Sequence, residues 1–436
     1  MKRTKKFDRL WEVGYGGTVN NTPAINNGVV YFGAMDGYLY AVDAEKGKEI
    51  FKFKCGKGIA ECTPQIKGNA VYFGSFDTCF YCVSLKGKEV WRFRTGGEID
   101  VSSIVHKDCV IFCSRDSYAY CLYLDGREKW RFRTGDEIGA VPGAYKNKIF
   151  VGSFDGNLYC IDFDTGKEIW RFKTGAEIHN TNPMTMHDGV LYFASFDNYL
   201  YAVDISNGKE IWRFRTGQFG NSSSPAIHEG KIYYPSREGI MYCLDIKTGK
   251  EIWRFVSDAD NSLDQKPLVY EGILYFCGGG NFYALNPQSG HELWRVRTGG
   301  TIFSSPVHYK GKLYFGNWDC HLYVIDLETR KVAWSFTTST MQQSYLQDAF
   351  QEFKMEVKKT FSEKEIKEME KYKGKVGENI SLSNYHVTSE YSTTSEYKQK
   401  SDYDVNFVMF ESILEMEDLP CLLISEDLKP RTLTLN

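Results

Sequence analysis

Polar and charged side chains recur at the starts of short β-rich segments, where they could hydrogen-bond a small ligand or hold its charge. Lys266 is the only cation at its place in a repeating pattern, where other copies carry Thr, Ser, Val or Asn. Its ammonium group is expected either to anchor a ligand or to be solvated or paired within the protein. The candidate ligand-binding residues are Asn21, Glu61, Asp100, His179, Asn182, Asp264, Lys266 and Ser304.

Patterns typical of catalysis or metal binding are missing from the sequence. It contains eight His and twelve Cys, but no H-E-x-x-H, G-x-S-x-G, P-loop or G-x-G-x-x-G motif. Cys79 and Cys82 form a C-x-x-C, yet an odd offset on a strand points two side chains to opposite faces. His179 and His308 lie near strand starts, and an isolated His is usually a satisfied polar residue. We therefore predict no catalytic residue and no metal site.

The elements that would position these residues follow from an internal repeat. The segment TGKEIWRFKTG (165–175) has near copies along the chain, and its Trp position recurs every 39 to 42 residues. Within each copy, turns such as Asp-Gly and Thr-Gly separate three β-rich runs, and a fourth run precedes them. Each unit is predicted to be a four-stranded antiparallel meander. The repeated position is held by Trp11, Phe51, Trp91, Trp130, Trp170, Trp212, Trp253, Trp294 and Trp334.

Eight successive units predict an all-β fold, an eight-bladed β-propeller over residues 8–338. A solenoid would need atypical capping units, and neither end of the array is polar and divergent. The extra Trp segment around Trp11 is expected to complete or flank the last blade and so close the ring. Whether Trp11 or Trp334 supplies the outer strand of that blade stays open. This geometry places the candidate ligand-binding residues around a funnel at the axis.

The repeated pattern, DGxLYAxDxxTGKExWRFxTG, resembles the pyrroloquinoline-quinone (PQQ) enzyme repeat over about residues 8–338. That resemblance implies an eight-bladed propeller with tryptophan-docking contacts between blades. The repeat occurs in quinoprotein dehydrogenases, which bind PQQ and Ca²⁺, and in the non-catalytic propeller lipoprotein of the outer-membrane β-barrel assembly machine. It therefore implies the fold and leaves the function open. The chain departs from the dehydrogenases because it has no adjacent Cys pair, no long insertions between strands and no export signal.

The sequence changes character after Thr338. Apolar residues at helical spacing in 344–361, followed by a capping-box pattern at Ser362 and Glu365, predict a helical pair over 341–374. Residues 375–436 form an acidic, Tyr-rich tail in which Ser-x-Tyr recurs every six residues. An extended strand would place those Tyr on one face. We predict that this tail docks onto the propeller or onto a partner.

Composition and charge are those of an ordinary globular chain. Hydrophobic residues make up 42%, charged residues 25%, and the net charge is −3, so nucleic-acid and membrane partners are not expected. The basic N-terminal segment is not followed by an apolar stretch, and no run of 18 apolar residues exists. These features predict a cytoplasmic protein with reduced cysteines. The Arg and Lys residues of the Trp-bearing strands should point outward around the rim.

The favoured function is a non-catalytic scaffold or binding platform for protein or peptide partners, without a cofactor. Two alternatives stay open. The first is a quinoprotein-type oxidoreductase that binds PQQ with calcium. The second is a sensor of a small ligand at the propeller funnel.

Overall fold

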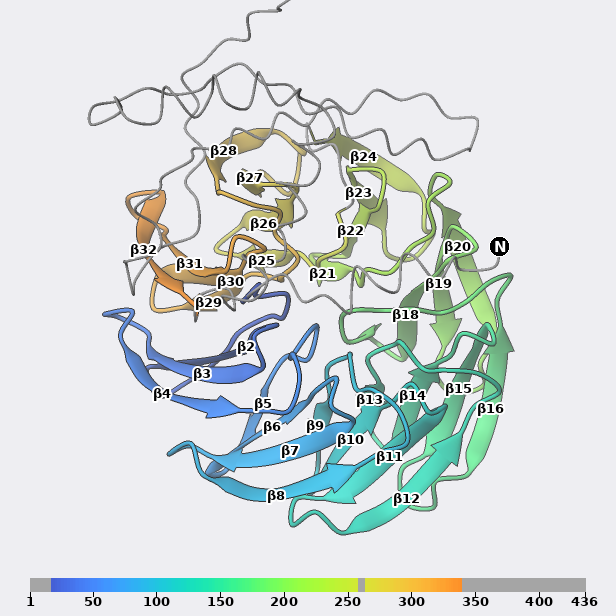
Figure 1. Cartoon of the computed structure of the whole chain (residues 1–436). Helices are drawn as coiled ribbons and strands as arrows, with labels where there is room; N and C mark the ends of the chain where they lie inside the picture. The colour runs from blue at the N-terminus through green and yellow to red at the C-terminus, as the bar shows by residue number, and fades with distance from the viewer. Residues whose placement is uncertain (1–16, 258–262, 339–436) are drawn as a thin grey trace, which may run out of the picture. The chain divides into compact units, whose positions relative to one another are not determined.

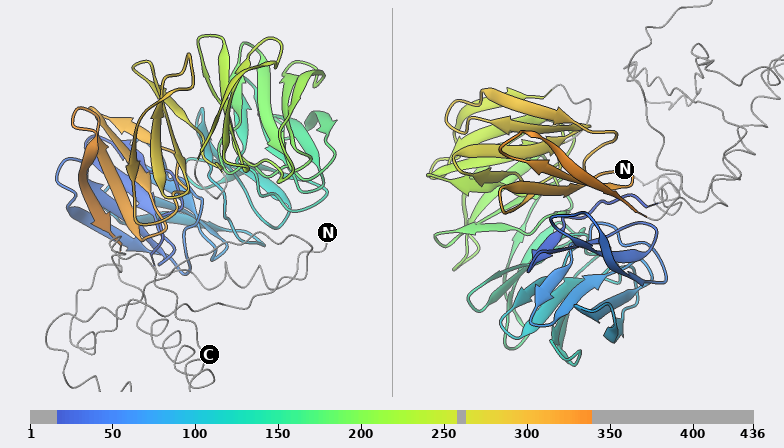
Figure 2. Two further views of the ribbon diagram at one scale, coloured as in Figure 1. Left: turned by 90° about the horizontal axis from the view of Figure 1, so that it is seen from above. Right: turned by 90° about the vertical axis from the view of Figure 1, so that its left-hand side faces the viewer.

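The chain forms eight four-stranded antiparallel sheets arranged radially, as the repeat predicts (Figure 1). The computed structural model describes residues 17–257 and 263–338. Within each sheet the strands are paired in chain order, so each blade is a simple meander. First strands lie near the axis and fourth strands at the periphery, and Figure 2 shows the blades from two other directions. The described residues contain no helix.

Strand lengths are nearly the same in every blade. The first strand has three residues and the other three have five to seven. Blades 1 and 2 comprise β1 (Ala24–Asn26), β2 (Val29–Gly33), β3 (Tyr38–Asp43), β4 (Glu49–Lys54), β5 (Gln65–Lys67), β6 (Ala70–Gly74), β7 (Cys79–Ser84) and β8 (Glu89–Arg94). Blades 3 and 4 comprise β9 (Ile104–His106), β10 (Cys109–Cys113), β11 (Tyr118–Tyr123), β12 (Glu128–Arg133), β13 (Gly143–Tyr145), β14 (Lys148–Gly152), β15 (Asn157–Asp162) and β16 (Glu168–Lys173).

The second half of the ring repeats this pattern. Blades 5 and 6 comprise β17 (Thr185–His187), β18 (Val190–Ser195), β19 (Tyr199–Asp204), β20 (Glu210–Arg215), β21 (Ala226–His228), β22 (Lys231–Ser236), β23 (Ile240–Asp245) and β24 (Glu251–Val256). Blades 7 and 8 comprise β25 (Leu268–Tyr270), β26 (Ile273–Gly278), β27 (Asn281–Leu285), β28 (Glu292–Arg297), β29 (Val307–Tyr309), β30 (Lys312–Gly316), β31 (His321–Asp326) and β32 (Lys331–Thr337).

The repeated aromatic residue of the fourth strand, Phe51 in blade 1 and Trp in the others, packs against a glycine of the next blade at every junction except that of blades 7 and 8, where Arg330 takes the glycine's place. Trp170 donates from Nε1 to the Ile205 carbonyl of the following blade (3.3 Å), and its ring lies against Gly208. A Cβ on Gly208 would lie 2.7 Å from that ring, so only glycine leaves room. Trp91, Trp130, Trp212 and Trp253 make the same type of hydrogen bond. The prediction that the aromatic side packs between blades is confirmed, and each such ring contributes roughly 2–3 kcal/mol by burial.

A second inter-blade contact uses a repeated carboxylate in the turn between the second and third strands. Asp77 accepts hydrogen bonds from the Tyr81 hydroxyl of its own blade (2.7 Å) and from the Gly56 amide of the preceding blade (2.7 Å). Asp116, Asp155 and Asp197 repeat this arrangement. Blade 7 lacks it, because Gly279 and Gly280 occupy the turn. The Asp-Gly pattern therefore marks both a turn and a clamp between blades.

The ring closes between blades 8 and 1, which lie side by side in both views of Figure 2. Trp334 lies in β32, so it supplies the outer strand of the last blade, and its ring packs against Gly47 of blade 1. Tyr314 donates to the Ala44 carbonyl across the same junction (2.8 Å). The amide of Val19 donates to the Asn317 carbonyl (3.0 Å). The proposed strand around Trp11 lies outside the described residues, as do the predicted helical pair (341–374) and the tail (375–436).

The rim carries the outward Arg residues that the alternation predicts, and the structure pairs them. Arg92 contacts Glu89 three residues earlier on the same strand, and its side chain is about half exposed. The equivalent arginines of blades 3 to 7 make the same pair. Each fourth strand also carries a bulge, as where Cys82 faces Trp91 and Val83 faces Glu89. Because bulges interrupt pairing, they protect the open outer edges from adding another strand.

The cysteines of the described residues are all buried and free. Cys82, Cys121, Cys160 and Cys243 occupy the small apolar position of the third strand that other blades fill with Ala or Val. Cys79 and Cys82 do not form a disulfide. Burial raises the pKa of the Cys82 thiol to about 11, so the thiolate form is disfavoured. These cysteines therefore act as core residues.

The docking contact can be tested with two glycines that share a left-handed backbone. Gly208→Ala (φ 73°) and Gly230→Ala (φ 72°) carry the same backbone strain, but only the first places a methyl group against a Trp ring. We expect Gly230→Ala to lower the free energy of unfolding by about 1 kcal/mol. Gly208→Ala should lower it by about 1–3 kcal/mol more. Chemical denaturation measures both, and equal losses would contradict the docking role of Trp170.

Candidate functional site

Two sets of loops form one face of the propeller, which we term the mouth face. They are the connections between blades and the turns between second and third strands. The turn residue donates its amide hydrogen to the neighbouring connection, as in Arg115 to Glu98 (2.9 Å) and Phe196 to Glu177 (2.9 Å). Phe76, Phe154, Met35 and Trp318 make equivalent bonds. Regular strands and these bonds therefore hold one variable turn residue at a constant place in six of the blades.

We term the variable turn residues the mouth ring. They are partly exposed and mostly large: Met35, Phe76, Arg115, Phe154, Phe196, Arg237 and Trp318. Arg115 lies over the Phe154 ring (4.9 Å from its centroid), and Arg237 over the Phe196 ring (5.4 Å). Such contacts hold a guanidinium on an aromatic face. The mouth ring thus combines apolar area with two oriented cations.

The side chain of His179 lies between two members of the mouth ring. Its ring centroid is 5.5 Å from that of Phe154 and 5.9 Å from that of Phe196. Gly139 leaves room for this packing, because a Cβ there would lie 2.7 Å from both His179 and Phe154. Predicted as a ligand contact, His179 has a packing role in this structure. His308 lies away from the mouth, in β29, where it stacks on Tyr270 at 3.7 Å between centroids.

Two ion pairs lie inside the mouth ring. Arg115 binds the Asp100 carboxylate through two nitrogens and reaches Glu137 at 3.2 Å. Arg237 lies 3.5 Å from the Asp264 carboxylate, which also accepts a hydrogen bond from Ser222 (2.8 Å). Both aspartates are predicted candidates, and each lies close enough to Glu61 to act on its carboxyl group. Each already has an arginine as a counter-ion.

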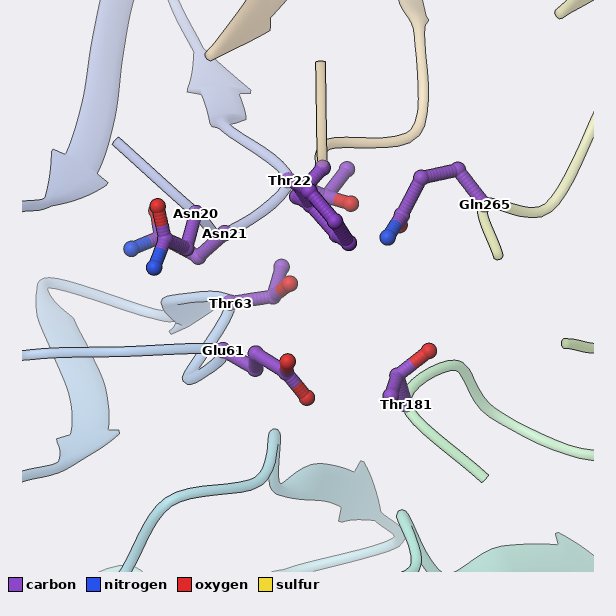
Figure 3. Close-up of a pocket in the computed structure, with 8 residues that line it drawn as sticks. Asn20, Asn21, Thr22, Glu61, Thr63, Thr181 and Gln265 are labelled. Atoms are coloured by element: carbon purple, nitrogen blue, oxygen red, sulfur yellow. The ribbon is translucent and has the colours of Figure 1, made fainter. Parts of the chain in front are cut away.

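A small cavity of about 10 Å³ lies among the residues that precede the first strands, enough for one water molecule. Its lining comes from blades 1, 2, 5, 7 and 8: Asn20, Asn21, Thr22, Glu61, Thr63, Thr181, Gln265 and Phe303. Figure 3 shows the Glu61 carboxyl group and the Gln265 amide reaching toward the same space from opposite sides. Burial raises the pKa of Glu61 to about 8, and the charges on Asp100 and Asp264 add to the effect.

The remaining candidates form hydrogen bonds between blades. Asn182 accepts from Ser305 (2.9 Å), and its backbone carbonyl accepts from Ser224 (3.2 Å). Lys266 donates to the Thr185 hydroxyl (3.0 Å), and burial lowers the pKa of its ammonium group to about 8. No carboxylate of the described residues pairs with it. Lys266 is therefore internally bonded, which was the alternative to ligand anchoring.

Two of the predicted contacts, Asn21 and Ser304, form hydrogen bonds within the propeller. Asn21 is almost fully buried, and its amide bonds the backbone of Gly33 and Ala60, which joins blade 1 to blade 2. Ser304 is fully buried and donates to the Ser305 carbonyl (3.3 Å). Gln265 and the mouth ring were not among the predicted contacts. The sequence does mark the mouth ring, because the turn between the second and third strands carries Met, Phe, Arg or Trp at one position and varies less at the others.

Metal-binding and membrane-spanning features are absent from residues 17–257 and 263–338. No group of three or more His, Cys, Asp and Glu side chains in these ranges could hold a metal ion. No helix within them is long and apolar enough to cross a membrane.

Glu61 predicts a pH dependence of stability with a defined sign. Its pKa in the folded protein, about 8, exceeds the ordinary 4.5, so the folded state holds a proton that the unfolded state has released between these values. The stability from this group is therefore present at low pH and is lost as the pH rises toward 8. We expect a slope of up to about 1.4 kcal/mol per pH unit. Denaturant unfolding across this range measures it.

Glu61→Gln should remove that slope, because the amide does not titrate. Glu177→Gln is the matched control, since Glu177 is exposed on the equivalent connection of another blade. An unchanged pH profile in Glu61→Gln would show that other groups cause the dependence.

Comparison with known proteins gives a family and several structural relatives. The family model described as "Outer membrane protein assembly factor BamB" matches residues 7–114, 115–279 and 237–417. No curated protein matches the sequence significantly. The computationally designed Ika8 protein is similar in structure, with a TM-score of 0.63, 15% identity, and coverage of 71% of this chain and 96% of that one.

Two natural proteins show the same likeness. BamB from Moraxella catarrhalis has a TM-score of 0.56 and 16% identity, covering 71% of this chain and 94% of that chain. The quinohemoprotein alcohol dehydrogenase of Comamonas testosteroni has a TM-score of 0.57 and 15% identity. The match covers 76% of this chain and 74% of that chain. At such identities these structures show the shared fold alone. Because the family model matches most of its length, the chain belongs to the family of PQQ-repeat propellers described as outer membrane protein assembly factor BamB.

Proposed function

We propose that the protein is a non-catalytic binding platform that holds a protein or peptide partner on its mouth face. The observation that carries this proposal is the mouth ring, which presents Phe, Trp, Met and Arg side chains on turns braced by backbone hydrogen bonds. These residue types are the ones enriched at protein interfaces. A rigid scaffold of this kind loses little conformational entropy on binding.

Phe219 extends this surface. It lies on the connection between blades 5 and 6 and is 68% exposed, an unusual exposure for so large an apolar side chain. The next residue, Gly220, packs against the Phe196 ring of the mouth ring. Phe219 is therefore placed beside the ring, where it would serve as an anchor for a partner.

Family membership agrees with this proposal without deciding it. The family is described as an assembly factor, and other proteins of the same fold are alcohol dehydrogenases. The prediction of a cytoplasmic location has no test in the structure and stays a prediction.

The residues of the cavity do not fit PQQ with calcium. A volume of about 10 Å³ is far too small for a tricyclic quinone, and Phe303 is stacked on Trp318 beside it (4.5 Å between centroids). The two aspartates that could hold a cation are paired with Arg115 and Arg237. The oxidoreductase alternative is therefore not favoured by the geometry.

The platform is tested by affinity purification of the tagged full-length protein from its native host, followed by binding measurements with the recovered partner. We expect Phe219→Ser to weaken partner binding by about 10-fold or more, as for an exposed aromatic anchor. Val90→Ser is the matched control, since Val90 is 60% exposed on the outer strand β8. Equal capture by the wild type and Phe219→Ser, or equal losses in both variants, would contradict a partner on the mouth face.

A further inference from the structure

The axial cavity is lined by polar groups that form no hydrogen bond with the described part of the chain. Gln265 is 5% exposed, and its side-chain amide has no hydrogen-bond partner among the described residues. Asn20 also lines the cavity, and its Oδ1 is buried without a partner. The Glu61 carboxyl group points into the same space and likewise makes no hydrogen bond within the described part of the chain. Glu61 and Gln265 can therefore form hydrogen bonds with a polar guest in this space.

The charges around the cavity indicate the sign of that guest. The carboxyl groups of Asp100 and Asp264 and the guanidinium groups of Arg115 and Arg237 all act on the Glu61 carboxyl group. Arg115 is bonded to Asp100 and Glu137, and Arg237 is paired with Asp264. Glu61 alone has no cation of its own. A guest with one positive charge would offset it, and an anion would be repelled.

The size and chemistry of the cavity narrow the chemical class of the guest further. A metal ion would need a group of three or more ligating side chains, and none occurs among the described residues. A primary ammonium group is about as large as a water molecule and has three N–H donors. Glu61 and Gln265 offer acceptor oxygens for them. Phe303, which also lines the cavity, offers an apolar surface for an aliphatic stem.

We propose that the axial cavity binds a primary ammonium group, with Glu61 as its counter-ion and Gln265 as a hydrogen-bond acceptor. The site goes beyond the proposed platform, because it lies at the axis and does not use Phe219. A free alkylamine and a lysine side chain of a peptide carry the same group. The test therefore has one arm for each source.

Binding is coupled to a proton. The Glu61 carboxyl group, with its pKa raised to about 8, is mostly neutral at pH 7 when the cavity is empty. Pairing with an ammonium ion requires the carboxylate, so the carboxyl proton passes to solvent as the guest enters. Affinity should therefore increase as the pH rises from about 6 to about 8, and the number of protons released should approach one near neutral pH.

The experiment is calorimetric titration of the full-length protein with n-propylammonium chloride and, separately, with a short blocked peptide that contains one lysine. Measurements in two buffers of different ionisation enthalpy give the proton release. Tetramethylammonium is the control ligand, because it has the charge but no N–H donor. We expect n-propylammonium to bind and tetramethylammonium to bind at least about 10-fold more weakly.

Two variants locate the site. Glu61→Gln keeps the shape of the side chain and should weaken n-propylammonium binding by about 10-fold or more and abolish the proton release. Gln265→Met removes an acceptor without changing a charge and should weaken binding by about 3- to 10-fold. Glu177→Gln, on the equivalent exposed connection, should bind as the wild type does.

Each outcome supports or overturns the proposal. Binding of n-propylammonium alone identifies a small amine as the guest, and binding of the lysine peptide identifies a side chain. No binding of either probe, equal affinity in Glu61→Gln, or equal affinity for tetramethylammonium would overturn the ammonium site. Because none of these measurements depends on Phe219, their failure would leave the protein platform standing.

Discussion

The structure depends on the packing of an aromatic ring against the glycine turn of the next blade at seven of its eight junctions. A four-stranded sheet of about twenty residues is too small to bury both faces by itself. Trp130 over Gly166 and Trp170 over Gly208 show how each sheet covers its neighbour. Because the contact is the same at successive junctions, each blade turns from the last by a constant step, and the ring closes when Trp334 reaches Gly47.

Closure of the ring brings together residues that are far apart in the chain. Glu61 of the second blade and Gln265 of the seventh point into one small space only because six other sheets set their distance (Figure 3). The neighbouring asparagines show the contrast. Asn21 uses its whole amide to join two blades, whereas Asn20 keeps a buried oxygen without a partner. The axis therefore holds both structural hydrogen bonds and groups that are available to a guest.

The departures from the repeat gather in blades 5 to 7. Glu238 replaces the usual Asp of the inter-blade clamp, and Gly279 and Gly280 remove the acid altogether in the following blade. The exposed Phe219 and the buried Lys266 lie in this same part of the chain. A repeat that needs only Trp, Tyr and Gly for packing leaves such positions free to vary, and variation on a rigid scaffold is where binding specificity arises.

The number of blades, their meander topology and the inward direction of the aromatic side chains could all be predicted from the residues. They depend on turn chemistry and on two-residue alternation, which act over a few neighbouring positions. For the candidate site, the structure adds positions that the sequence did not give. Glu61 lies close to Asp100 and Asp264, whereas His179 packs between aromatic rings and Asn21 bonds two blades, and Gln265 was not among the predicted residues. Burial, ion pairing and the direction of a side chain at the axis depend on all eight blades at once, so the folded ring alone decides which polar groups are satisfied and which stay free.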